Sequence, residues 1–124
     1  MTPDLFQNLV LGWMAIGLAT FVLLFFISAP YGRFARSGWG PVLPARLGWV
    51  LMEMASPLLF GALFLTGAQR SPAAWAFLVL WEAHYLHRAF LYPLTLANPR
   101  PMPASVVGMG AMFNLVNAGT NGYF

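Results

Sequence analysis

The sequence predicts an all-α integral membrane protein, a bundle of four transmembrane helices. Apolar residue types make up 60% of the 124 residues and charged types only 7%, whereas soluble domains carry about 25% charged residues. The mean hydropathy is +0.70. Four apolar runs, separated by segments rich in proline, glycine and arginine, fill almost the whole chain. No stretch is polar enough for a soluble domain, so we expect residues 1–124 to form a single transmembrane domain.

The first apolar run covers residues 9–29 and contains no charge over about the 20 residues that a spanning helix needs. Asp4 precedes it and no basic residue does, unlike the positively charged start of a signal peptide. We therefore expect a retained transmembrane helix. The segment that follows, residues 30–44, is rich in proline and glycine and predicts a loop.

The other three helices are expected at residues 45–67, 73–94 and 104–124. The first of these contains Glu53 and Pro57, and the last is rich in glycine and asparagine. A short turn separates the second and third helices. The loop before the fourth helix holds three prolines and Arg100.

The arginines predict the orientation in the membrane. Five of the six basic residues flank the first and third loops, and Arg70 alone lies on the other side. The positive-inside rule then puts the N-terminus outside or in a lumen and loops one and three in the cytoplasm. Arginines dispersed over several loops are not typical of a nucleic-acid-binding surface. The absence of cysteine excludes disulfides and thiolate metal sites.

Ionisable side chains within membrane helices indicate a functional site, because burying them is costly. Glu53 lies seven residues after Arg46, and Tyr85 lies seven residues before Tyr92. At about 1.5 Å per residue, both side chains sit roughly 10 Å below the cytoplasmic boundary. Two antiparallel helices joined by a short turn would therefore bring Glu53 and Tyr85 to the same level.

Helical spacing places polar residues in three stripes, one on each of three helices. At about 100° per residue, Trp81, Tyr85, Arg88 and Tyr92 share one face of the third helix, with His84 at its edge. Similar stripes are Trp49, Glu53 and Ser56 on the second helix, and Asn114, Asn117 and Asn121 on the fourth. Together they predict a polar-lined cavity. A tyrosine beside a buried carboxyl can donate a hydrogen bond to a carbonyl oxygen, which suits the reduction or enolisation of an apolar carbonyl substrate.

Structural explanations compete with these functional ones. Glu53 could have the structural role of a hydrogen-bond partner for a neighbouring helix, and Tyr85 could be a packing or interfacial residue. The asparagine stripe is equally typical of helix packing. Arg88 either reaches the membrane surface or pairs with an acid. His84 and His87 are only three residues apart and share a face only in part, so we expect no metal site.

At these residues the chain resembles the steroid 5α-reductase family. The matching motifs are PAR-x-x-W-x-x-x-E from Pro44 to Glu53 and HY-x-HR from His84 to Arg88. Further matches are the segments 29–33, 92–93, 100–103 and 113–117. Their order and spacing agree over nearly the whole chain. The combination of the two motifs is specific, and either alone would be weaker.

The resemblance implies a seven-helix membrane enzyme that reduces the C4–C5 double bond of 3-oxo-Δ4-steroids with NADPH. It implies that Glu53 and Tyr85 bind and polarise the C3 carbonyl. From the depth and face of the third helix, His84 and Arg88 are expected to be supporting polar groups. The residues that it implies for the steroid slot are Trp49, Met109, Phe113 and Asn117. The residues that it implies for the cofactor are Tyr31, Asn98 and Arg100.

Family members are about twice as long, so the resemblance implies that the chain is the N-terminal half and is inactive without the C-terminal half. The expected partners are a steroid or other lipid substrate, membrane lipid and that second half, with no nucleic acid. Two other functions stay open. One is a related reductase of enoyl or polyprenol lipids. The other is a small four-helix proton-coupled transporter that uses Glu53 as its protonatable site.

Overall fold

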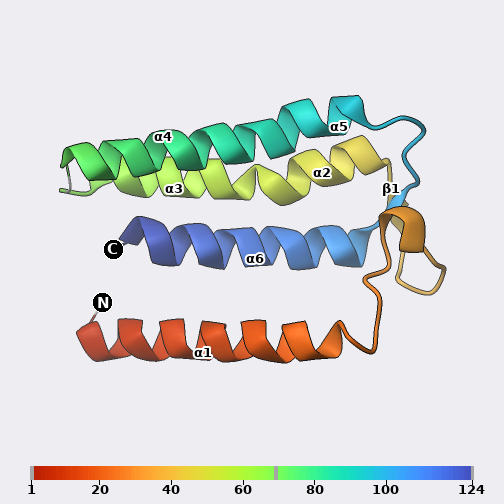
Figure 1. Cartoon of the computed structure of the whole chain (residues 1–124), viewed down its shortest axis with the longest axis horizontal. Coiled ribbons are helices and arrows are strands. Elements are labelled where there is room, and N and C mark those ends of the chain that lie inside the picture. The colour runs from red at the N-terminus through yellow and green to blue at the C-terminus, as the bar shows by residue number, and fades with distance from the viewer. Residues whose placement is uncertain (1, 69, 124) are drawn as a thin grey trace.

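The computed structural model describes residues 2–68 and 70–123, and most of them are helical. The elements in chain order are α1 (Pro3–Leu23), η1 (Gly32–Phe34), β1 (Val42–Leu43), α2 (Ala45–Glu53), α3 (Ala55–Thr66), α4 (Pro72–Leu86), η2 (His87–Leu91), α5 (Tyr92–Thr95), β2 (Met102–Pro103) and α6 (Ala104–Tyr123). Figure 1 shows the long helices as nearly parallel rods, in which α6 lies between α1 and the rod formed by α2 and α3.

The first helix spans Pro3–Leu23, so the predicted range of 9–29 is wrong by six residues at each end. The Thr2 hydroxyl caps the helix by accepting a hydrogen bond from the Leu5 N–H at 3.4 Å, and Pro3 follows at the first helical position. Asp4 is tolerated because a negative charge is favourable at a helix N-terminus. The prediction used the absence of charge and so began too late.

The second predicted helix, residues 45–67, is divided into α2 and α3 at Met54. Pro57 causes the break, because it has no N–H to donate to the carbonyl four residues earlier, that of Glu53. The break places Glu53 at the last residue of α2. The sequence had marked both Glu53 and Pro57 as interruptions, but a single helix was expected through them.

The third predicted helix, residues 73–94, forms one rod from α4 through η2 to α5. The Ser71 hydroxyl caps its start. The π-turn η2, in which the Tyr92 N–H donates to the His87 carbonyl, comes directly before Pro93. A π-turn lets the rod continue into a proline that would clash with regular α-helix hydrogen bonding.

Two short strands join the first and third loops, although the sequence predicted no strand. In the antiparallel pair β1–β2, Val42 faces Pro103 and Leu43 faces Met102. The Ala104 N–H extends the pairing by donating to the Pro41 carbonyl at 2.8 Å. This strand pair holds the start of α6 beside the start of α2. The fourth predicted helix, 104–124, agrees with α6, and Phe124 lies outside the described residues.

Small residues allow α6 to pack closely on α2 and α3. A Cβ atom on Gly110 would lie 2.2 Å from the Met52 sulfur, so only glycine fits there without a shift of that side chain. Met52 belongs to a cluster of buried apolar residues, together with Met102, Val106 and Val107. Stacked rings join α3 to α4, where the Phe60 and Trp81 centroids are 4.6 Å apart.

The helix α1 is attached more loosely. None of its residues, all of which the structure describes, is buried. It meets α6 through ring contacts, Trp13 with Phe113 and Phe6 with Tyr123, each at a centroid distance of 5.5 Å. Among the residues that the structure describes, two helical segments are long and apolar enough to cross a membrane, Pro3–Leu23 and Ala45–Thr66. The apolar helices are therefore consistent with a membrane protein.

Candidate active site

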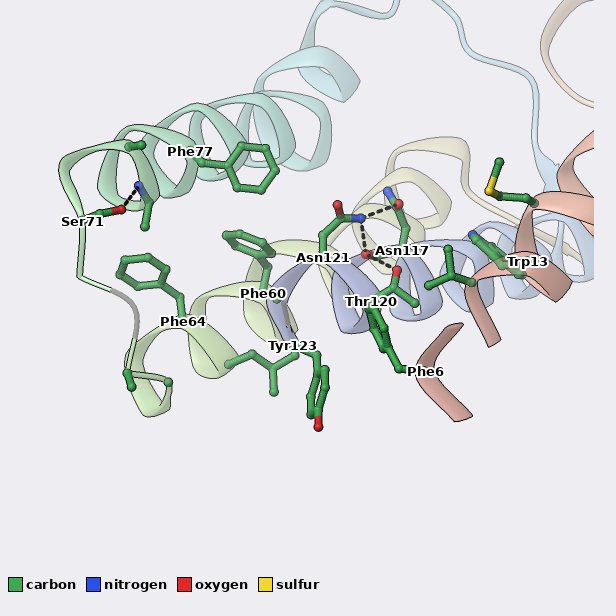
Figure 2. A pocket seen from close by; sticks show the side chains of 18 residues that line it. Phe6, Trp13, Phe60, Phe64, Ser71, Phe77, Asn117, Thr120, Asn121 and Tyr123 are labelled. Atoms are coloured by element: carbon green, nitrogen blue, oxygen red, sulfur yellow. Dashed lines mark hydrogen bonds between the residues drawn. The ribbon is translucent and has the colours of Figure 1, made fainter. Parts of the chain in front are cut away.

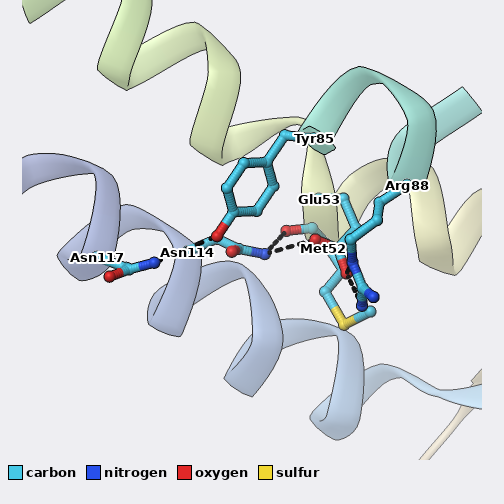
Figure 3. A network of polar contacts seen from close by, with 6 residues as sticks. All are labelled: Met52, Glu53, Tyr85, Arg88, Asn114 and Asn117. Atoms are coloured by element: carbon cyan, nitrogen blue, oxygen red, sulfur yellow. Dashed lines mark hydrogen bonds and ion pairs between the residues drawn. The ribbon is translucent and has the colours of Figure 1, made fainter. Parts of the chain in front are cut away.

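Glu53 is buried at the end of α2 and accepts hydrogen bonds from two other rods (Figure 3). One carboxylate oxygen accepts from Arg88 Nε at 3.1 Å and from Arg88 Nη2 at 2.7 Å. The other oxygen accepts from Asn114 Nδ2 at 3.2 Å. The side chain of Glu53 is 4% exposed and that of Arg88 40%. All these partners are donors, so the carboxylate acts as an acceptor and is balanced by the arginine.

Arg88 lies at the start of the π-turn and bridges two groups. Its guanidinium carbon is 5.2 Å from the centroid of the Trp49 ring, within range of a cation–π contact. The Trp49 ring in turn meets Tyr92 edge-on at 4.9 Å. Of the two roles considered for Arg88, the structure therefore shows pairing with an acid.

Tyr85 is buried on α4, close to the Glu53 network. Its hydroxyl oxygen accepts a hydrogen bond from Asn117 Nδ2 at 3.2 Å. Its ring lies against Trp81 and His84, each at 5.0 Å between centroids. In the described part of the chain no hydrogen bond joins Tyr85 to Glu53. The two side chains are nevertheless brought to the same cavity.

This cavity has a volume of about 550 Å³ and lies between α1 and the other rods. Seven of the predicted site residues line it, namely Tyr31, Glu53, His84, Tyr85, Arg88, Met109 and Phe113. One wall is formed by apolar residues at the end of α1 and just beyond it, such as Leu23 and Ile27. Its volume is in the usual range for a small-molecule site.

Two residues expected in the steroid slot lie elsewhere. Trp49 is behind Arg88 and lines a smaller hollow of about 350 Å³. Asn117 lines a hollow of about 900 Å³ at the other end of the molecule (Figure 2). The face argument placed Trp49 with Glu53, but the Arg88 side chain lies between the Trp49 ring and the carboxylate.

The three residues expected at the cofactor, Tyr31, Asn98 and Arg100, come together in the 350 Å³ hollow. Asn98 has a φ of +48°, a left-handed conformation that asparagine tolerates well. A guanidinium, an amide and a phenol can bind phosphate and ribose oxygens. The residues therefore fit one part of a dinucleotide, and the hollow is too small for all of it. Tyr31 lines this hollow and the 550 Å³ cavity, which makes the two neighbours.

The 900 Å³ hollow in Figure 2 is larger but holds fewer ionisable groups. Its lining is dominated by rings, among them Phe6, Trp13, Phe60, Phe64 and Phe77. Asn117, Thr120 and Asn121 form its polar edge. We place the candidate site in the smaller cavity, because Glu53, Tyr85 and Arg88 all face it.

Sequence reasoning left Asn114 out of the candidate site. Asn114 is 4% exposed, and its amide nitrogen donates both to Glu53 and to the Met52 carbonyl, the latter at 2.8 Å. The signal was present in the asparagine stripe of the fourth helix. The stripe alone could not tell which of its members faces the carboxylate.

Comparison with known proteins places this arrangement in context. No protein-family model matches the chain. It is 38% identical over 120 residues to "Steroid 5-alpha-reductase DET2" of Gossypium hirsutum, and these residues are 91% of this chain and 46% of the relative. It is 35% identical over 125 residues to "3-oxo-5-alpha-steroid 4-dehydrogenase 2" of Sus scrofa, covering 95% of this chain and 48% of the relative. The chain spans about half the length of the curated relatives it matches.

Proposed function

We propose, from the premise that this chain is a relative of the steroid 5-alpha-reductases, that it forms the N-terminal half of a membrane reductase of 3-oxo-Δ4-steroids. The observation that carries the proposal is the cavity of about 550 Å³, in which a buried tyrosine and a Glu53–Arg88 ion pair line walls that are otherwise mostly apolar. Such a cavity suits a rigid apolar molecule with one polar end.

The reaction adds a hydride to C5 and a proton to C4 of the steroid. As the hydride arrives, the electron pair of the C4–C5 double bond shifts to C4, and negative charge develops on the C3 oxygen. The Tyr85 hydroxyl donates a hydrogen bond to that oxygen and so stabilises the charge as it forms. When the C3 carbonyl is restored, the electron pair at C4 takes up a proton.

Glu53 serves this chemistry by holding its neighbours. It accepts from Arg88 and from Asn114, which fixes one wall of the cavity around the carbonyl end of the substrate. Glu53 and Tyr85 polarise the carbonyl in different ways. Tyr85 donates a hydrogen bond to it directly, whereas Glu53 acts through Arg88 and the Asn114 amide, which it orients. The same arrangement counts against a proton-coupled carrier, which needs an acid free to exchange its proton.

NADPH, when bound, would supply the hydride. Tyr31, Asn98 and Arg100 would hold part of it in the hollow beside the substrate cavity. Met109 and Phe113 would contact the steroid rings. The hollow holds only a fraction of a dinucleotide, so we propose that the second half of the enzyme completes the cofactor site.

The test uses membranes that contain the protein expressed from its complete reading frame, incubated with progesterone or testosterone and NADPH. We expect a 5α-reduced product. Tyr85→Phe keeps the ring but removes the donor, and should lower kcat by about a hundredfold or more, in line with the loss of an oxyanion donor. Tyr123→Phe, at the far end of α6, is the matched control and should leave kcat unchanged.

Two results would count against the proposal. If an enoyl or polyprenol lipid is consumed and no steroid is, the enzyme is a related lipid reductase with a different substrate. If Tyr85→Phe retains full steroid turnover, Tyr85 is not the donor.

A further inference from the structure

A series of hydrogen bonds leads from α6 to Tyr85. Its first members, Asn121 and Asn117, are shown in Figure 2. The side-chain nitrogen of Asn121 lies 2.8 Å from the backbone oxygen of Asn117. A carbonyl oxygen can only accept, so the end of the Asn121 amide that faces it must be the NH₂ group. This contact fixes the orientation of the Asn121 amide.

The next link follows from the first. The same Asn121 nitrogen is 3.1 Å from Oδ1 of the Asn117 side chain. Because Asn121 donates here, Asn117 must present its oxygen to it and turn its own NH₂ group away. That NH₂ group lies 3.2 Å from the hydroxyl oxygen of Tyr85, as Figure 3 shows.

The last link concerns the phenol hydrogen. Since the Tyr85 oxygen accepts from Asn117, the hydrogen of the hydroxyl is not used in that contact. No described residue receives it, and Tyr85 lines the cavity beside Glu53. The hydroxyl is thus set as a donor toward the cavity.

We propose that Asn117 and Asn121 are positioning residues, which together orient the Tyr85 hydroxyl so that its hydrogen faces the bound carbonyl. The proposal rests on the proposed function, in which that acceptor is the substrate C3 oxygen. It gives Asn117 a different role from the steroid contact that the family resemblance implied. It also gives a role to Asn121, for which the resemblance implied none.

The proposal can be tested by exchanging donor and acceptor in the hydrogen bonds that link Asn121, Asn117 and Tyr85. Asn117→Asp keeps the shape but replaces the donor with a carboxylate, which would capture the Tyr85 hydrogen. Asn121→Asp removes the donor to the backbone oxygen, so the Asn117 amide should turn over and present its oxygen to Tyr85. Asn121→Leu removes the link without adding a charge, in case the acidic variants fail to fold. Asn121→Gln keeps the side-chain amide, with its NH₂ donor, and should retain the turnover of the wild type.

Thr120→Val is the control from the same turn of α6. Its hydroxyl donates to the backbone oxygens of Val116 and Asn117 but takes no part in the side-chain links to Tyr85. We expect its turnover to equal that of the wild type. Equal losses in Thr120→Val and Asn121→Leu would show a general packing effect and overturn the proposal.

The kinetic readout is the separation of kcat from KM in the full-length protein. Asn117→Asp should lower kcat by about a hundredfold and Asn121→Asp by about tenfold or more, as expected when a transition-state donor is lost or misdirected. KM should change little, because the apolar walls are intact. A rise in KM at constant kcat would instead make Asn117 an ordinary substrate contact and overturn the proposal.

An infrared measurement separates this inference from the proposed function. A saturated 3-oxo-5α-steroid labelled with ¹³C at C3 binds without turnover, and its C=O stretching band should shift to lower frequency in the wild type. Loss of the shift in Asn117→Asp supports the inference, even if no Δ4-steroid is reduced and the proposed function fails. A shift that persists in Asn117→Asp overturns the inference, even if the enzyme is active. A ligand that does not bind the wild type at all rejects both.

Discussion

The Glu53 carboxylate accepts hydrogen bonds from two other rods, and the two donor side chains differ in their exposure to solvent. Arg88 is partly exposed, whereas Asn114 is buried and also serves the Met52 carbonyl. Removing one member of a buried ion pair is costly, because the remaining charge has no partner. The cost should therefore depend on which member remains.

We expect Arg88→Met to lower the free energy of unfolding by about 3 kcal/mol, because it leaves a buried carboxylate without its cation. Glu53→Gln should cost about 1 kcal/mol, since Arg88 can then reach more polar surroundings and the new amide can still accept from Asn114. The double variant should be more stable than Arg88→Met alone. Denaturant titration in micelles would measure this, and strictly additive losses would contradict the coupling.

The residue types around the site could be predicted from the sequence, but their pairing could not. Spacing along the helices brought Glu53 and Tyr85 to one level, and both do line one cavity. The same spacing put Trp49 beside Glu53, although the Arg88 side chain occupies that position. Which long side chain fills a gap depends on packing across helices, which a single helical wheel does not contain.

At the scale of the elements, proline residues shape the surroundings of the site. Pro57 ends α2 just after Glu53, and Pro93 follows the π-turn that contains Arg88. Both halves of the ion pair therefore lie where regular α-helix hydrogen bonding is interrupted. Helix periodicity predicted helical segments on both sides of each proline, but it could not place the break or the π-turn, because both depend on how the freed backbone groups are accommodated.

Pro57→Ala should test the break directly. The new N–H can donate to the Glu53 carbonyl, so α2 and α3 should join into one regular helix. We expect stability to be kept or raised, while kcat falls about tenfold or more because Glu53 and Arg88 are displaced from their geometry. Circular dichroism and turnover on the same samples would measure both. Pro72→Ala, at the start of α4, is a control that removes a proline without touching the site.

The start of α1 shows a different limit of sequence reasoning. The apolar run identified a helix, but the cap at Thr2 and the proline after it decide where the helix begins. The acidic Asp4 in the first turn is compatible with this start, because a negative charge is favourable at a helix N-terminus. The prediction followed the apolar run, which begins at Leu9, and therefore missed the cap.

For the whole molecule, we propose that the N-terminus lies outside or in a lumen and that loops one and three are cytoplasmic. The chain has no cysteine, so single cysteines give an unambiguous label. Ser37→Cys in the first loop should not react with a membrane-impermeant thiol reagent added to sealed vesicles whose outer face is the non-cytoplasmic one. It should react once the membrane is permeabilised and the reagent reaches the cytoplasmic face. Ala68→Cys, in the α3–α4 turn, should show the opposite accessibility. Labelling of both from one side would contradict the orientation.

The loose attachment of α1 has a consequence for affinity. The cavity lies between α1 and the other three rods, and no residue of α1 is buried against them. A ligand that contacts both α1 and the other helices needs α1 in place, so its apparent dissociation constant is the intrinsic one divided by the fraction of time that α1 is there. This factor is common to all such ligands, whereas their contacts with Tyr85 and with the α1 side chains of the lining differ from one ligand to the next.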